Sequence, residues 1–185
     1  ISWRCTELDP SVHAGALAQQ LLDAEVHRWR LQREPGGETS TGALESIFIN
    51  LGIDTDSARH LTALATYLDF WAPHTFADPQ ARELLQQLRT DGLLIGVLSN
   101  TLWPRTHHQE VFERDNLSEL IDAACYTSEM PVAKPHLDAF KLIAGEIGVK
   151  PEHCVFVGDR LWDDIFGAQQ IGMRAIWIPH SRVPT

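Results

Sequence analysis

Apolar residues recur with helical spacing through the first part of the chain. A first segment runs from about residue 11 to residue 34 and ends at Pro35-Gly36-Gly37. The same spacing predicts a second helix from about Thr41 that ends at Gly52, and a third from Thr55 or Asp56 that ends at Pro73. No convincing strand interrupts these segments, so the pattern indicates a helical unit.

From about residue 76 onward, short apolar runs alternate with helical stretches. The apolar runs cover residues 93–98, 123–126, 154–157 and 174–178. The helical stretches cover about 79–89, 105–114, 136–147 and 163–171. The run at 93–98 is typical of a strand buried on both faces. This alternation predicts an α/β fold with a parallel sheet and right-handed crossovers.

Length and composition fit this division. The chain has 185 residues, of which 44% are hydrophobic and 22% charged, as in ordinary globular proteins. That length allows one core with a modest additional unit. We therefore expect a helical domain over residues 1–75 and an α/β domain over residues 76–185.

Charge and cysteine usage narrow the function classes. The net charge of −10 argues against nucleic acid as a partner, because phosphates favour a basic surface. The three cysteines have no CxxC spacing, which favours a reducing cytoplasmic compartment over a disulfide framework. No run approaches 18 apolar residues, so we expect no membrane-spanning helix. The sequence gives no signal for the oligomeric state.

Polar side chains follow three of the predicted strands. Ser99 and Asn100 follow the first, Lys134 lies in the loop after the second, and Asp159 and Asp164 follow the third. The carboxyl ends of parallel strands meet at one edge of a sheet, where ligands bind. Carboxylates suit Mg²⁺, and hydroxyl, amide and ammonium groups suit phosphoryl oxygens. The pattern predicts a metal-assisted phosphoryl site.

The same residues resemble the haloacid dehalogenase (HAD) superfamily of hydrolases. The segments Val97-Leu98-Ser99-Asn100 and Val132-Ala133-Lys134-Pro135-His136 are similar to its second and third motifs. The segment from Phe156 to Ala168, which reads FVGDRLWDDIFGA, is similar to its fourth. The resemblance covers about residues 76–180 and implies a HAD-like Rossmannoid parallel sheet. The helical first part is similar in kind to the family's C1 cap.

The resemblance also implies roles for these residues. Ser99 would hold a phosphoryl oxygen, and Asn100 would support that loop as part of the phosphate-binding site. Lys134 would be the catalytic residue that neutralises the nucleophile and the phosphate. Asp159 would bind Mg²⁺, and Asp164 would be the second metal-binding acid. The implied activity is Mg²⁺-dependent hydrolysis of a small phosphorylated metabolite through an aspartyl phosphate.

One family motif is not found where it belongs. The family's first motif is an apolar strand that ends in Asp-x-Asp, whose first Asp attacks phosphorus. The only such triplet here is Asp54-Thr55-Asp56, which has the pattern of a helix cap. We therefore expect the nucleophile strand, central in the family's sheet, to lie upstream of Ile1. The chain as printed would then be inactive, with a gap between the strands at 93–98 and 154–157.

Other readings stay open at this point. A 2-haloacid dehalogenase shares the fold and the aspartyl nucleophile, but dehalogenases of this family lack an Asp at the position of Asp159. A non-catalytic HAD-like binding or regulatory protein would follow if the first motif were absent from the gene. The role of Asp163 is open, and Trp103 and Arg105 could face a substrate or simply pack. We expect His107-His108 to be surface residues.

Overall fold

The structure, a computed structural model, describes residues 54–178 together with Gln19, Leu22, Asp23, Val26, His27, Arg30 and Ile49. The first two predicted helices, and most of the domain expected over residues 1–75, lie outside the described residues. No helix in the described part is long and apolar enough to cross a membrane.

The described chain begins with the third predicted helix. This helix, α4, covers Ala58–Trp71, and the 3₁₀ turn Ala72–His74 follows it directly. Its N-cap is Ser57, whose hydroxyl oxygen accepts a hydrogen bond from the His60 N–H at 3.2 Å. The cap therefore lies one or two residues beyond the predicted one, within the usual uncertainty of helix ends.

The predicted alternation of helices and strands is confirmed from residue 81 onward. The strands are β1 (Gly96–Ser99), β2 (Ala123–Tyr126), β3 (Val155–Gly158) and β4 (Arg174–Trp177). The helices are α5 (Ala81–Thr90), α6 (Arg105–Arg114), α7 (Leu137–Glu146), a π-helical turn (Leu161–Phe166) and the short α8 (Gly167–Gln169). Two 3₁₀ turns, Ser118–Leu120 and Pro151–His153, precede β2 and β3.

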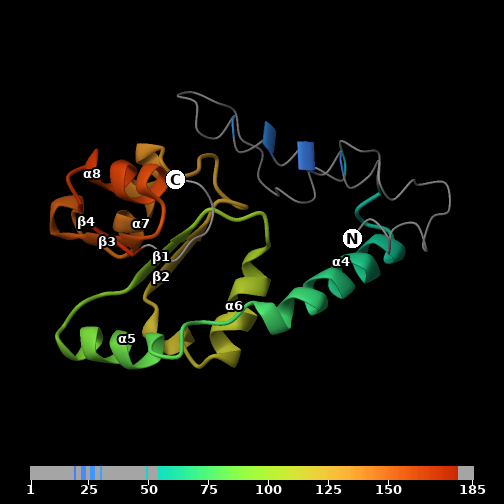
Figure 1. Ribbon diagram of the computed structural model, residues 1–185, viewed down its shortest axis with the longest axis horizontal. Helices are drawn as coiled ribbons and strands as arrows, with labels where there is room; N and C mark the ends of the chain where they lie inside the picture. Colours follow the sequence, from blue (N-terminus) through green and yellow to red (C-terminus); the bar gives the residue numbers. More distant parts are fainter. Residues whose placement is uncertain are drawn as a thin grey trace.

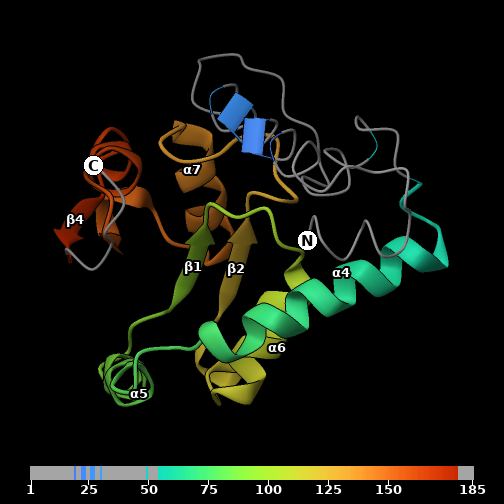
Figure 2. The same ribbon diagram turned by 45° about the vertical axis from the view of Figure 1, so that its right-hand side comes forward.

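The strands form two separate parallel pairs in the described residues. β1 pairs with β2, and Gly96 lies opposite Ala123. β3 pairs with β4, and Val155 lies opposite Arg174. β1 and β3 are not paired with each other. Figure 2 shows β1 and β2 side by side, with α7 between them and the β3–β4 pair.

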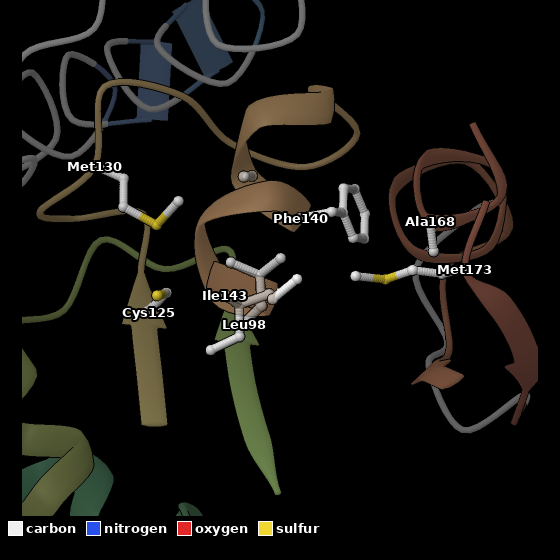
Figure 3. Close-up of a cluster of buried hydrophobic side chains, with 9 residues drawn as sticks. Leu98, Cys125, Met130, Phe140, Ile143, Ala168 and Met173 are labelled. Carbon is white, nitrogen blue, oxygen red and sulfur yellow. The ribbon is translucent and has the colours of Figure 1, made fainter. Parts of the chain in front are cut away.

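One buried cluster connects the two pairs through α7 (Figure 3). Phe140 of α7 is fully buried and meets the Phe156 ring edge-on, with centroids 5.0 Å apart. Leu98 and Cys125 join the cluster from β1 and β2, and Ala168 and Met173 join it from the α8 side. The core therefore packs both strand pairs against α7.

The prediction of a strand over residues 93–98 that is buried on both faces is wrong at its start. The strand begins at Gly96, and Leu93 and Leu94 are 53% and 51% exposed. Pairing with β2 starts only where the Asp122 N–H donates to the Ile95 carbonyl at 2.8 Å. Gly92, at φ 82°, ends α5 just before this point, so Leu93 and Leu94 form a connection rather than part of the sheet.

Candidate active site

The loop after β1 is joined to the loop after β2 by the Asn100 side chain. Its amide nitrogen donates to the Lys134 carbonyl at 3.0 Å, and its amide oxygen accepts from the Lys134 N–H at 2.9 Å. Both polar atoms of Asn100 thus bind one peptide unit. The Ser99 hydroxyl makes no hydrogen bond within residues 54–178. Asn100 therefore supports the loop, while Ser99 keeps a free hydroxyl at the strand end.

Lys134 reaches across the core to the loop after β3. Its Nζ lies 2.6 Å from Asp164 Oδ1, and the two side chains are only 10% and 4% exposed. The ammonium also lies 5.2 Å from the centre of the Phe156 ring. A pair this deeply buried is little screened by solvent, so each partner depends strongly on the other.

Asp164 also organises the turn that follows β3. Its Oδ2 accepts hydrogen bonds from the backbone N–H groups of Asp159 and Arg160, at 3.1 Å and 3.0 Å. Gly158 allows this approach, because a Cβ there would collide with the Asp164 carboxylate. Asp164 lies in the helical turn Leu161–Phe166, and its carboxylate thus fixes the backbone of the two residues that precede this turn.

Asp159 differs from Asp164 in having a free carboxylate. Its backbone carbonyl accepts the Trp177 indole N–H at 3.0 Å, but its carboxylate has no hydrogen bond or ion pair within residues 54–178. The side chain is half-buried at the end of β3. A free hard-oxygen donor beside a satisfied carboxylate fits Mg²⁺, which takes few protein ligands and keeps several waters.

No group of three His, Cys, Asp or Glu side chains in the described part forms a metal site. Asp159 would therefore need further ligands, from water, substrate or another segment. In this conformation both oxygens of Asp164 are engaged, so Asp164 would act on the metal less directly than Asp159.

Asp163, whose role the sequence leaves open, pairs with Arg160. The Arg160 Nε lies 2.6 Å from Asp163 Oδ2, and the Asp163 side chain is only 2% exposed. Sequence reasoning did not identify Arg160 as the partner of Asp163. The signal was present in the i, i+3 spacing of opposite charges at the start of a predicted helix.

The prediction that His107 and His108 are surface residues is wrong. His107 is 4% exposed, and His108 stacks on the buried Tyr126 ring with centroids 4.6 Å apart. Burial lowers the pKa of His108 to about 4, with a further contribution from His107. The His108 Nε2 also lies within hydrogen-bond distance of the Thr101 hydroxyl, at 3.0 Å.

Trp103 and Arg105 belong to the same packed region. Trp103 meets the His107 ring edge-on, with centroids 4.4 Å apart. Arg105 pairs with Glu129 at 2.8 Å and lies 4.9 Å from the centre of the Tyr126 ring. Trp103 thus packs against α6, while Arg105 joins α6 to β2 and to the loop after it.

The Asp54-Thr55-Asp56 triplet forms a helix-capping turn. Asp54 Oδ1 accepts the Asp56 N–H at 3.1 Å, and the Ser57 hydroxyl donates to the Asp54 carbonyl at 2.7 Å. Figures 1 and 2 both place this end of α4 away from the carboxyl ends of the strands. The triplet does not take the position of the family's first motif.

Comparison with known proteins identifies the family. The family model for haloacid dehalogenase-like hydrolases matches residues 13–172. The chain belongs to this hydrolase family. A glyceraldehyde 3-phosphate phosphatase of Methanopyrus kandleri is 30% identical over 173 residues, which are 92% of this chain and 72% of that protein. A phosphoglycolate phosphatase of Mannheimia succiniciproducens is 28% identical over 103 residues, or 56% of this chain and 45% of that protein.

Two other relatives align with this chain over less than half of their own length. The glyceraldehyde 3-phosphate phosphatases of Pyrococcus furiosus and Pyrococcus abyssi are 31% and 28% identical over 56% of this chain. The chain spans only 42% and 43% of those two proteins.

Solved structures show the same fold. A HAD phosphatase from Thermococcus onnurineus has a TM-score of 0.70 at 18% identity, covering 100% of this chain and 78% of its own. An L-2-haloacid dehalogenase has a TM-score of 0.61 at 23% identity, covering 99% of this chain and 81% of its own. Because phosphatase and dehalogenase share the fold, the fold does not separate the two chemistries.

Proposed function

We propose that the full-length protein is a Mg²⁺-dependent phosphatase of a small phosphorylated metabolite. The observation that carries this proposal is the free Asp159 carboxylate beside the buried Lys134–Asp164 pair, in the segments that follow β3 and β2. Ser99 adds a free hydroxyl at the end of β1. A cation, a hard-oxygen donor and a hydroxyl donor are the groups that a phosphoryl site needs.

The proposed catalytic role of each residue follows from these contacts. An Asp on an upstream strand would attack phosphorus, and an acid two residues later would protonate the leaving oxygen and then activate water. Lys134 would hold positive charge near the nucleophile and the transferred group, fixed there by Asp164. Ser99 would donate to a phosphoryl oxygen. Mg²⁺ bound at Asp159 would neutralise phosphate charge.

Relatives named as phosphatases support the phosphatase over the dehalogenase. Their names specify glyceraldehyde 3-phosphate, phosphoglycolate and phosphoserine as substrates of those proteins. Asp159 supports the same choice, because the family's dehalogenases lack an acid at this position. A non-catalytic binding role is favoured only if the gene encodes no upstream Asp-x-Asp strand.

The test uses full-length protein and p-nitrophenyl phosphate, with Mg²⁺ or with EDTA. We expect hydrolysis with Mg²⁺, its loss in EDTA, and its loss in Asp159→Asn. Asp91→Asn is the matched control, because Asp91 is exposed at the end of α5. Wild-type hydrolysis that persists in EDTA, or halide release from a 2-haloacid in place of phosphate release, contradicts the proposal.

A further inference from the structure

The Arg160–Asp163 pair fixes a guanidinium beside the candidate site. Arg160 is the N-cap residue of the turn Leu161–Phe166 and directly follows Asp159. Its backbone N–H is held by Asp164, while its side-chain Nε is held by Asp163 at 2.6 Å. The residue is thus fixed at two points by carboxylates that are 3% and 2% exposed.

The contact with Asp163 uses only one end of the guanidinium. Within residues 54–178, neither Nη atom of Arg160 makes a hydrogen bond, and the side chain is 32% exposed. The two Nη groups form the end-on fork, whose parallel N–H bonds match the two oxygens of a carboxylate. A fork that is anchored from behind loses less conformational entropy when it binds an anion.

We propose that Arg160 is a specificity-determining residue that binds a carboxylate on the substrate, and that Asp163 is its positioning residue. This inference rests on the proposed function. Lys134 is engaged by Asp164, so Arg160 supplies the open cationic donors next to Asp159. In a chain of net charge −10, such fixed donors favour an ester that carries a carboxylate as well as the phosphate over one whose only anionic group is the phosphate.

The test compares two phosphate esters, of which only one carries a carboxylate. Phosphoglycolate carries a carboxylate where glycolaldehyde phosphate carries an aldehyde. We measure kcat/KM for both with full-length wild type, Arg160→Gln and Asp163→Asn. Arg174→Gln is the control, because Arg174 is an exposed arginine on β4. Thermal unfolding of each variant reports its folding.

We expect wild type to prefer phosphoglycolate. Arg160→Gln should lower kcat/KM for phosphoglycolate by roughly 10- to 100-fold, the range of a charge-assisted hydrogen bond, and change that for glycolaldehyde phosphate by less than about threefold. Asp163→Asn should reduce the same preference by a smaller factor, mainly through KM. Arg174→Gln should leave both values unchanged.

The outcomes separate this inference from the proposed function. If wild type hydrolyses both esters and Arg160→Gln lowers both equally, or neither, Arg160 does not bind the carboxylate and the phosphatase stands. If wild type hydrolyses neither ester nor p-nitrophenyl phosphate, the phosphatase is overturned, and this inference with it.

Discussion

At the scale of single residues, the site depends on one buried carboxylate. Asp164 accepts a hydrogen bond from the Lys134 ammonium and two from backbone N–H groups of the turn after β3. It thereby holds both the proposed catalytic cation and the residue proposed to bind metal. Burial makes this arrangement sensitive, because a charge left without its partner in the interior is strongly unfavourable.

Lys134→Ala tests the cation directly. We expect kcat/KM of the full-length protein for p-nitrophenyl phosphate to fall by about a thousandfold or more, because several kcal/mol of transition-state stabilisation would be lost. Lys150→Ala is the control, since that side chain is 76% exposed. Near-normal turnover in Lys134→Ala, with unchanged thermal unfolding, would show that this lysine has no catalytic role.

Gly158→Ala tests the close approach of Asp164 to the backbone. The added methyl group would overlap the Asp164 carboxylate and force the turn to shift, at a cost of about 1–3 kcal/mol in the free energy of unfolding. Gly145→Ala is the matched control, because a Cβ at that helical position meets nothing within 4 Å. Thermal unfolding should show a lower midpoint for Gly158→Ala only; equal midpoints would contradict the packing described here.

At the scale of elements, local signals predicted the ends of the helices well. Gly148 and Gly172 directly follow the predicted helical stretches 136–147 and 163–171, and their φ values of 71° and 84° favour glycine. Sequence spacing could not predict which residues meet across elements. The Asn100–Lys134 contact joins residues 34 positions apart, and His108 packs on Tyr126 of β2, 18 positions further along the chain.

The packing of α6 on β2 has a consequence for stability at acid pH. Burial lowers the pKa of His108 to about 4, below the usual 6.5. Between these values the unfolded chain binds more protons at this site than the folded one, so the free energy of unfolding falls as pH falls from about 6.5 to about 4. The burial of α6 against β2 is thus favoured near neutral pH.

His108→Phe tests how much the titration of His108 contributes to the pH dependence of the free energy of unfolding. Phe retains a ring to stack on Tyr126 but cannot titrate, so the decrease in the urea unfolding midpoint from pH 7 to pH 5 should be smaller than in wild type. His153→Gln, which changes an exposed histidine, should retain the wild-type decrease. Identical pH dependence in wild type and His108→Phe would contradict the lowered pKa.

At the scale of the whole molecule, β1 and β3 each have one edge without a partner strand among the described residues. The Ile95 and Ser99 carbonyls accept hydrogen bonds from the segment around β2, at Asp122 and Thr127. Since backbone groups alternate along a strand, the Leu98 N–H faces the other edge. The apolar side chains Val155 and Val157 of β3 are 43% and 52% exposed, which is unusual for a strand of a parallel sheet.

β3 has an edge of the same kind. The Cys154 and Gly158 carbonyls accept from Arg174 and Ile178 on the β4 side, so the Val157 N–H faces away from β4. Leu98 is only 7% exposed, and a buried N–H without a partner costs about 1–3 kcal/mol. One added parallel strand between β1 and β3 would satisfy both edges, cover the exposed valines and bring its terminal residues to the carboxyl ends of β1 and β3, beside Ser99 and Asp159.

Hydrogen exchange tests whether such a strand belongs there. We compare residues 1–185 alone with a version extended at the N-terminus by an apolar strand of about five residues that ends in Asp-x-Asp. The amides of Leu98 and Val157 should exchange slowly only in the extended version, and the thermal midpoint should rise. An extension with prolines at alternate positions is the control, because proline has no N–H to donate to the sheet. Equal exchange at Leu98 and Val157 in all three proteins would contradict a strand between β1 and β3, and with it the placement of the nucleophile beside Lys134 and Asp159.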